Sequence, residues 1–107
     1  MTAARGEVWE YADPSAGRAR VVVVSSDVHN ERPNAWPLCA LVTRHSPATE
    51  IPLFTVALAD PDPLGGHVIT STVRGLDPQG LDKRLGMLTG STMVDLGRAI
   101  RDLFDLD

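Results

Sequence analysis

The positions of the prolines divide this chain into two parts with different expected structures. All eight prolines lie between Pro14 and Pro78, and residues 79–107 contain none. Proline lacks a backbone donor and is confined to turns, strand ends and sheet edges, so frequent prolines break a chain into short extended pieces. The first part is therefore expected to form short strands joined by turns, whereas the last part is free to form a helix.

Short runs rich in β-branched and apolar residues lie between the prolines, which is typical of strands. Continuous valines at 21–24 predict a strand buried on both faces. We expect a turn at residues 13–17, with exposed polar loops at 26–34 and a further loop at 44–52. The six expected strands, the last of them short, cover residues 6–12, 20–25, 38–43, 53–58, 67–73 and 84–88.

The periodicity of the apolar residues changes after residue 88. Thr89 is a suitable helix N-cap. After it, apolar side chains recur every three or four residues and form one stripe of an amphipathic helix over residues 90–104. The stripe consists of Met93, Leu96, Ile100, Leu103 and Phe104. Strands followed by a single helix predict an α+β domain, a small and strongly bent β-barrel with the helix over one open side.

Composition limits the class of protein. The 107 residues are enough for one domain, expected to span residues 1–107, and 43% hydrophobic with 22% charged residues indicate an ordinary globular chain. The apolar runs are far shorter than a membrane span, and residues 1–5 do not resemble a signal peptide. The single cysteine, Cys39, cannot form an intrachain disulfide. We therefore expect a cytoplasmic protein without membrane attachment.

The charge balance argues against nonspecific coating of nucleic acid. Ten basic and fourteen acidic residues give a net charge of −4, which is the wrong sign for a protein that neutralises many phosphates. A small local basic site remains compatible with this balance. Nine of the ten basic residues are arginine, whose planar fork suits phosphate recognition, although a GC-rich genome produces the same bias.

Searches for common catalytic motifs exclude several kinds of site. Gly65–Gly66 is followed by His67 rather than the lysine of a nucleotide-binding loop, and no dinucleotide fingerprint occurs. The histidines His29, His45 and His67 lack the spacing of a zinc site. Cys39 lies in an apolar strand, where a thiol is usually inert. No metal and no cofactor are expected.

Two polar residues at strand ends are candidates for a shared site. Arg20 begins the most apolar strand, and Thr43 ends the next one. If these strands pair antiparallel, the start of one lies beside the end of the other, so the two residues would meet at one edge. Arginine and threonine also flank strands for purely structural reasons, and spacing alone does not separate the two interpretations.

Several segments together resemble one family. The opening Arg5–Trp9, with Asp13–Pro14 and Gly17, is similar to the first strand and turn of the MazF/PemK/Kid toxins. The run Arg20–Ser25 resembles their Arg-Pro-hydrophobic strand, with Asn30 matching the asparagine of the following loop. The hydrophobic-Thr and Arg-Leu-Gly motifs of the family resemble further segments of this chain: Leu41–Thr43, Val73–Asp77 and Lys83–Thr89.

The resemblance implies an SH3-like barrel with a C-terminal amphipathic helix, paired as a homodimer. It implies a metal-free endoribonuclease toxin that cleaves single-stranded RNA by 2′-hydroxyl attack, leaving a 2′,3′-cyclic phosphate and a 5′-hydroxyl, and that is opposed by a cognate MazE-like antitoxin. The family's catalytic arginine and threonine correspond to Arg20 and Thr43. Candidate RNA contacts, with His45 also a candidate general base, are Arg18, Arg44, His45 and Arg74.

This chain departs from the family pattern near the expected site. Only Arg18 and Ala19 separate Gly17 from Arg20, where relatives carry a longer loop, and Arg44 replaces a small hydroxyl residue after Thr43. Two other readings therefore stay open. One is a catalytically degenerate or non-nuclease binding module on the same fold, for example one that inhibits a protein target such as gyrase. The other is a structural barrel within a larger complex.

Overall fold

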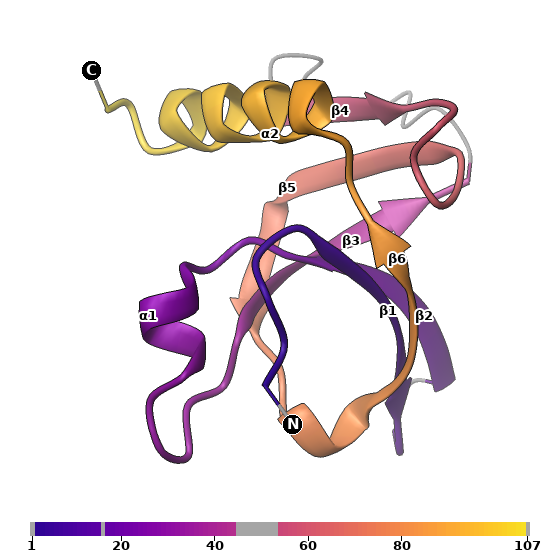
Figure 1. The fold of residues 1–107 in the computed structure, drawn as a ribbon, viewed down its shortest axis with the longest axis vertical. Helices are drawn as coiled ribbons and strands as arrows, with labels where there is room; N and C mark the ends of the chain where they lie inside the picture. The colour runs from indigo at the N-terminus through magenta and orange to yellow at the C-terminus, as the bar shows by residue number, and fades with distance from the viewer. Residues whose placement is uncertain (1, 16, 45–53, 107) are drawn as a thin grey trace.

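The structure, a computed structural model, describes residues 2–15, 17–44 and 54–106. It consists of six strands, a short α-helix after the second strand, a 3₁₀ turn before the last strand, and a longer α-helix near the C-terminus (Figure 1). The elements in chain order are β1 (Glu7–Asp13), β2 (Gly17–Val23), α1 (Asp27–Asn30), β3 (Leu38–Thr43), β4 (Thr55–Leu58), β5 (Gly66–Gly75), the 3₁₀ helix η2 (Pro78–Gly80), β6 (Leu81–Met87) and α2 (Gly90–Leu103).

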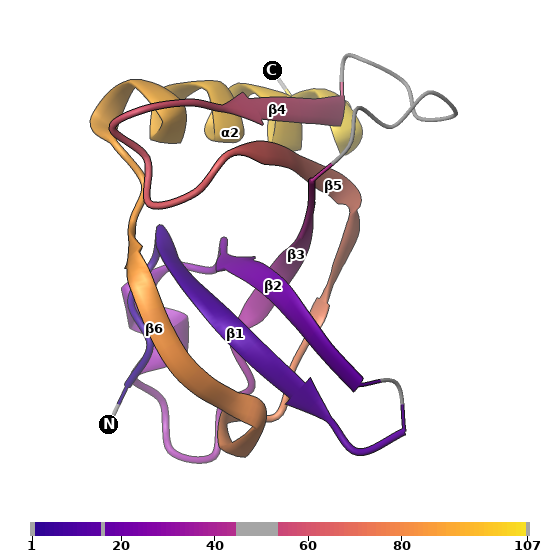
Figure 2. The same cartoon turned by 90° about the vertical axis from the view of Figure 1, so that its right-hand side faces the viewer.

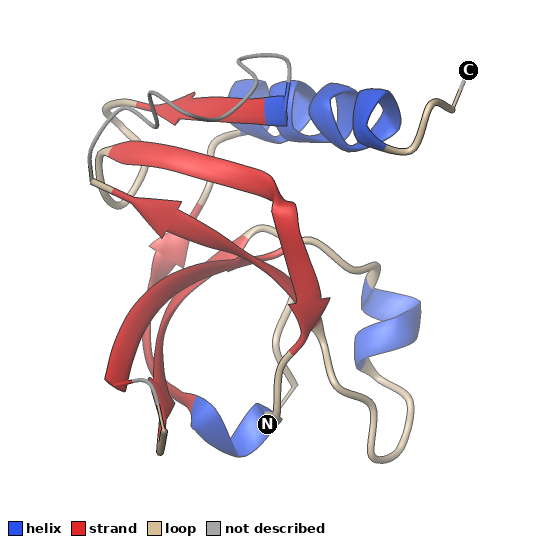
Figure 3. Ribbon diagram, turned by 180° about the vertical axis from the view of Figure 1, so that it is seen from behind, coloured by secondary structure: helices blue, strands red, loops and turns tan. Residues whose placement is uncertain are grey.

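The strands form one antiparallel sheet in the order β4-β5-β3-β2-β1-β6. The sheet is strongly bent, as Figures 1 and 2 show. Within the described residues β4 and β6 are its two edges and do not pair with each other. The sheet is therefore not closed, and the SH3-like barrel expected from the sequence is not confirmed. The chain passes from β6 into α2, which packs on β4 and β5; helix packing, not a strand ladder, connects the two ends of the sheet (Figure 3).

A break in the β3–β5 ladder accounts for the bend in β5. Leu41 pairs with Ile69, whereas Cys39 pairs with Arg74, so several residues of β5 leave the ladder. The Thr72 hydroxyl fills part of the gap: it accepts a hydrogen bond from the Leu41 amide at 2.8 Å and donates to the Ile69 carbonyl at 2.6 Å. Such irregularities increase local twist and redirect a strand.

The sheet buries apolar side chains on both faces. On one face Val8, Val22 and Ala40 are cross-strand neighbours and pack with Leu96 of α2. On the other face a second cluster lies inside the curl of β1, β2 and β6; it contains Ala3, Trp9, Tyr11, Val21, Val23, Cys39 and Leu76. The prediction that the valine run is buried on both faces is confirmed, since alternate residues of β2 enter different clusters.

The sequence predicted the C-terminal helix α2 but not the short helix α1. Thr89 is the N-cap of α2, as predicted, and its side chain accepts from the Thr92 amide. The expectation of an entirely irregular loop at residues 26–34 is wrong, because Ser26 caps a single helical turn by accepting from the His29 amide. Neither helix of the described chain is long and apolar enough to span a membrane.

Candidate functional site

Arg20 is half-buried on β2, one of the inner strands of the sheet. Its cross-strand partners are Glu10 on β1 and Val42 on β3. Directly opposed residues of an antiparallel pair project to the same face. Arg20 therefore shares the face that buries Val22 and Ala40 further along the strands, and it marks the point where this face changes from apolar to charged.

Two adjoining cavities share the Arg20 side chain. One, of about 360 Å³, is lined by Arg20, Arg44 and the segment 64–66 that leads into β5. The other, of about 180 Å³, is lined by Glu10, Arg18, Ala19 and Arg20. We call the two cavities together the Arg20 site. Among the described residues its ionic groups are three guanidinium groups and one carboxylate. A chain of net negative charge therefore carries a local excess of positive charge in this described lining.

The three arginines of the Arg20 site differ in their partners. Arg18 is exposed and forms ion pairs with Asp82 and, at 3.2 Å, with Glu10. The hydrogen bonds to Asp82 and Glu10 raise the pKa of Arg18. Within the described residues neither Arg20 nor Arg44 is in an ion pair. These two guanidinium groups are consequently available for an anionic ligand.

Thr43 lies at the same end of the sheet as Arg20 but on a different face. The antiparallel pairing of β2 and β3 is as expected, and Thr43 follows Val42, the partner of Arg20. Because side chains alternate along a strand, Thr43 projects opposite to Val42, together with its own cross-strand partner His67. The residue of this segment that shares a cavity with Arg20 is Arg44.

His67 and Glu10 are two polar residues next to the predicted pair that sequence reasoning did not select. His67 faces Thr43 across the β3–β5 ladder, and its buried Nδ1 has no hydrogen-bond partner among the described residues. Glu10 faces Arg20 across the β1–β2 ladder. Both lie in predicted strands, but only the register between strands, which no local pattern specifies, reveals what each residue faces.

Gly66 holds the start of β5 against the end of β3. Its φ is +112°, and a Cβ placed there would lie 2.2 Å from the Thr43 carbonyl oxygen. A side chain is thus excluded both by the conformation and by contact with rigid backbone. Gly66 also lines the cavity with Arg20 and Arg44, so this close approach shapes the Arg20 site.

The Gly66→Ala variant is expected to be destabilised by about 1–3 kcal/mol, because the strained conformation and the backbone clash both act on it. Gly65→Ala is the matched control, since a Cβ there would meet nothing within 4 Å. Urea unfolding followed by circular dichroism measures both variants. Equal stability of the two variants would show that the β3–β5 contact is looser than described.

Of the two remaining candidate RNA contacts, only Arg74 lies in the described part of the chain. Arg74 is exposed and pairs with Cys39, which lies at the other end of β3, about four residues from Thr43. Arg74 lines neither cavity of the Arg20 site. The structure therefore does not bring Arg74 to Arg20. His45, the candidate base, lies outside the described residues.

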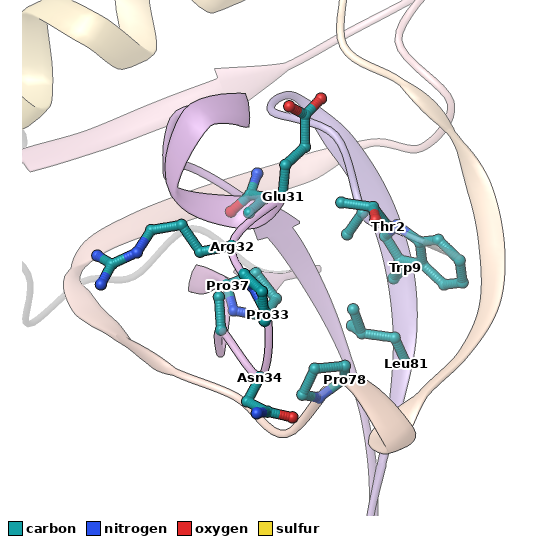
Figure 4. A pocket seen from close by; sticks show the side chains of 12 residues that line it. Thr2, Trp9, Glu31, Arg32, Pro33, Asn34, Pro37, Pro78 and Leu81 are labelled. Carbon is teal, nitrogen blue, oxygen red and sulfur yellow. The ribbon is translucent and has the colours of Figure 1, made fainter.

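A separate cavity of about 300 Å³ lies on the opposite face of β1 (Figure 4). Trp9 and Leu81 line one side, and Pro33 and Pro37 line the other, while the Arg32 side chain extends away from them. The Trp9 indole N–H donates to Glu7 at 3.3 Å. Since this cavity shares no lining residue with the Arg20 site, it is a distinct feature of the molecule.

Metal and thiol chemistry receive no support from the described side chains. Among the residues described, no group of three or more His, Cys, Asp and Glu side chains is placed to hold a metal ion. Cys39 is a free, buried cysteine, and burial raises the pKa of its thiol to about 12. The prediction that this cysteine is inert packing agrees with its surroundings.

Comparison with known proteins decides the family. A family model described as "PemK-like, MazF-like toxin of type II toxin-antitoxin system" matches residues 4–104. The chain belongs to this family. The resemblance seen in its motifs is thereby confirmed, and the match includes every element from β1 to α2. No curated protein sequence matches the chain significantly.

Solved structures share the PemK/MazF fold over nearly the full chain. A mycobacterial endoribonuclease in complex with its cognate antitoxin has 24% identity and a TM-score of 0.88, covering 98% of this chain and 97% of that one. MazF in a MazE–MazF complex from Deinococcus radiodurans has 19% identity and a TM-score of 0.79, covering 100% and 99%. The Mycobacterium tuberculosis toxin MazF-mt6 has 17% identity and a TM-score of 0.76, covering 94% and 98%.

Proposed function

We propose that this PemK/MazF-like toxin is a metal-independent endoribonuclease that cleaves single-stranded RNA at specific sequences. The observation that carries the proposal is the Arg20 site, where Arg20 and Arg44 line one cavity without ion pairs in the described residues. Family membership supports the proposal, and so do the structural relatives described as endoribonucleases.

The chemistry uses groups of the chain, the RNA and solvent water. The ribose 2′ oxygen attacks the adjacent phosphorus as its hydroxyl proton is removed, the bond from phosphorus to the 5′ oxygen breaks, and the 5′ oxygen takes up a proton. The products are a 2′,3′-cyclic phosphate and a 5′-hydroxyl. Negative charge accumulates on the phosphoryl oxygens during the step, and Arg20 offers forked donors that stabilise it. Arg44 adds a second cation, since it lines the same cavity.

Thr43 is proposed as a second functional group that acts from the rim of the sheet. Its hydroxyl can donate to a phosphate oxygen or hold a ribose hydroxyl. Side chains alternate between the two faces along β3, so Thr43 points away from the face that carries Arg20. We therefore infer that Thr43 contacts the RNA chain where this RNA passes around the end of β3. Thr43→Val would then weaken RNA binding more than it lowers the rate of the bound complex.

The remaining partners follow from family and relatives. A cognate antitoxin of the MazE type is proposed, since relatives of this fold have been seen in complex with antitoxins. A homodimer and a cytoplasmic location belong to the same proposal. Arg18, Arg74 and His45 are proposed RNA contacts, with Arg18 the one that adjoins Arg20 in a shared cavity.

Incubation of the purified protein with long unstructured transcripts in EDTA tests the proposed function. We expect cleavage at a small number of recurring sequences, with 5′-hydroxyl ends in a sequencing-based map of the products. A protein that binds RNA without producing such ends would contradict the nuclease proposal and favour a non-catalytic binding module on this fold. Loss of cleavage in EDTA, restored by a divalent metal, would contradict the metal-independent mechanism.

A further inference from the structure

The carboxylate directly across the sheet from Arg20 has no role in the mechanism above. We propose that Glu10 is the general base that takes the proton of the attacking 2′-hydroxyl. This inference deepens the proposed nuclease function and rests on it. It fills a specific need, because arginine stays protonated at physiological pH and is a poor proton acceptor.

Glu10 lies beside Arg20 on one face of the sheet. Glu10 and Arg20 are directly opposed in the β1–β2 ladder, which places their Cβ atoms roughly 4.5–5.5 Å apart and on one face. The two side chains line the same cavity of about 180 Å³. A phosphate held by Arg20 would therefore bring its neighbouring ribose within reach of the Glu10 carboxylate.

The Glu10 carboxylate is held through one of its two oxygens. The side chain of Glu10 is 29% exposed, and its Oε2 accepts a hydrogen bond from Arg18 at 3.2 Å. Within the described residues the Glu10 side chain accepts no other hydrogen bond. Its second oxygen, Oε1, is therefore left to accept a proton from a ligand. An anchored carboxylate with one uncommitted oxygen is the arrangement that general-base catalysis requires.

Cationic residues neighbour Glu10 on both adjacent strands. A carboxylate beside a phosphate would normally repel it. Here Arg18 and Arg20 flank Glu10 from β2, and Lys83 is its cross-strand partner on β6. These cations offset the repulsion, so the Arg20 site attracts RNA while it keeps a base in the cavity.

The proposed step conserves atoms and charge. Oε1 of Glu10 removes the 2′-hydroxyl proton as the 2′ oxygen bonds to phosphorus and the bond to the 5′ oxygen breaks. The 5′ oxygen leaves with the electron pair of that bond and takes a proton from a solvent water. The resulting hydroxide takes the proton from Glu10, which restores the carboxylate. The net change is transfer of one proton from the 2′ to the 5′ oxygen.

The decisive comparison is between Glu10→Gln and Asp82→Asn. Both variants remove one acidic partner of Arg18, but Asp82 does not line the Arg20 site. The substrate is a short RNA spanning a site found in the 5′-hydroxyl map. Single-turnover rates are measured on this RNA, and affinities on the same RNA with a 2′-deoxy nucleotide at the cleaved position. Thermal unfolding establishes that each variant is folded.

For Glu10→Gln we expect a rate roughly 10²–10⁴-fold lower, with unchanged or tighter binding of the deoxy RNA. Glu10→Asp should recover part of the rate, and Asp82→Asn should cleave within about twofold of wild type. A Glu10→Gln variant at the wild-type rate would overturn the assignment. So would an equal loss in Asp82→Asn, which would make Glu10 a partner of Arg18 alone.

His67 provides the competing assignment, because it faces Thr43 and has a buried nitrogen without a partner. If His67→Gln loses the rate and Glu10→Gln does not, the base lies on the Thr43 face and the proposal for Glu10 is wrong. Failure of the nuclease function and failure of the Glu10 assignment give different results. A wild-type protein that cleaves no RNA contradicts the nuclease function itself, whereas an active wild type with an active Glu10→Gln variant contradicts only the role of Glu10.

Discussion

Arg20→Ala is expected to lower the single-turnover rate of RNA cleavage by roughly 10²–10³-fold, the cost of removing one principal donor to a developing anionic charge. Arg20 is the residue common to both cavities of the Arg20 site, so no other cation occupies an equivalent position in the described structure. The rate is measured on the short RNA that spans a mapped cleavage site, with the protein at a saturating concentration. Arg20→Lys should restore only part of the loss, because an ammonium cannot form the two parallel bonds of a guanidinium.

The matched control for this prediction is Arg74→Ala. Arg74 is exposed and lies outside both cavities of the Arg20 site, so its removal changes the net charge equally without touching that site. We expect a rate within a few-fold of wild type, with somewhat weaker RNA binding. Equal losses in the two variants would mean that general electrostatic attraction, rather than the Arg20 site, accounts for the effect. Full activity of Arg20→Ala would remove Arg20 from the mechanism.

Patterns with a short period along the chain predicted the fold well. The helix α2 followed from the apolar stripe and the Thr89 N-cap, and β3 was predicted with its observed bounds. The burial of β2 on both faces followed from its valines. In each case the signal lies within a few residues and depends on local geometry, which is the information that a sequence carries most directly.

Features that depend on contacts between distant segments were predicted less well. The sheet is open, with α2 packed on β4 and β5 between its two ends. The apolar stripe on α2 predicts a helix but does not specify where that helix packs. The bend of β5 accompanies the break in its ladder with β3, where the hydroxyl of Thr72, an ordinary strand residue in the sequence, fills part of the gap. The position of Glu10 opposite Arg20, and of His67 opposite Thr43, depends on strand register. The sequence could therefore nominate Arg20 and Thr43 as neighbours but could not place them on different faces.

Asp62 connects the Arg20 site to the helix, and its removal is expected to have the second large effect. Its buried carboxylate accepts three hydrogen bonds: from the Ala59 amide at 3.2 Å, the Thr89 amide at 2.9 Å and the Thr92 hydroxyl at 2.8 Å. The last two donors belong to the N-terminus of α2. The carboxylate thus fastens the segment before β5, which lines the Arg20 site, to the helix that covers the sheet.

The Asp62→Asn variant is expected to lose about 3 kcal/mol of unfolding free energy at pH 7. An amide has one acceptor oxygen, so its NH₂ group would face a buried donor, and each unsatisfied buried group costs about 1–3 kcal/mol. Urea unfolding measures the loss. Asp95→Asn is the control, because Asp95 is exposed on α2 with a long 3.9 Å ion pair to Arg98, and such pairs contribute about 1 kcal/mol or less.

The same variant should change the pH dependence of stability. Burial acts to raise the pKa of Asp62, but the hydrogen bonds from Thr89, Thr92 and Ala59 outweigh it, and the pKa lies below its usual value. The folded state therefore gains stability that is fully present above the unfolded pKa of about 3.9 and is lost as the pH falls through the folded pKa. The gap between wild type and Asp62→Asn should narrow below about pH 4, measured by urea unfolding at pH 7 and pH 3. A gap that stays constant would show that packing, rather than the ionised carboxylate, accounts for the contribution of Asp62.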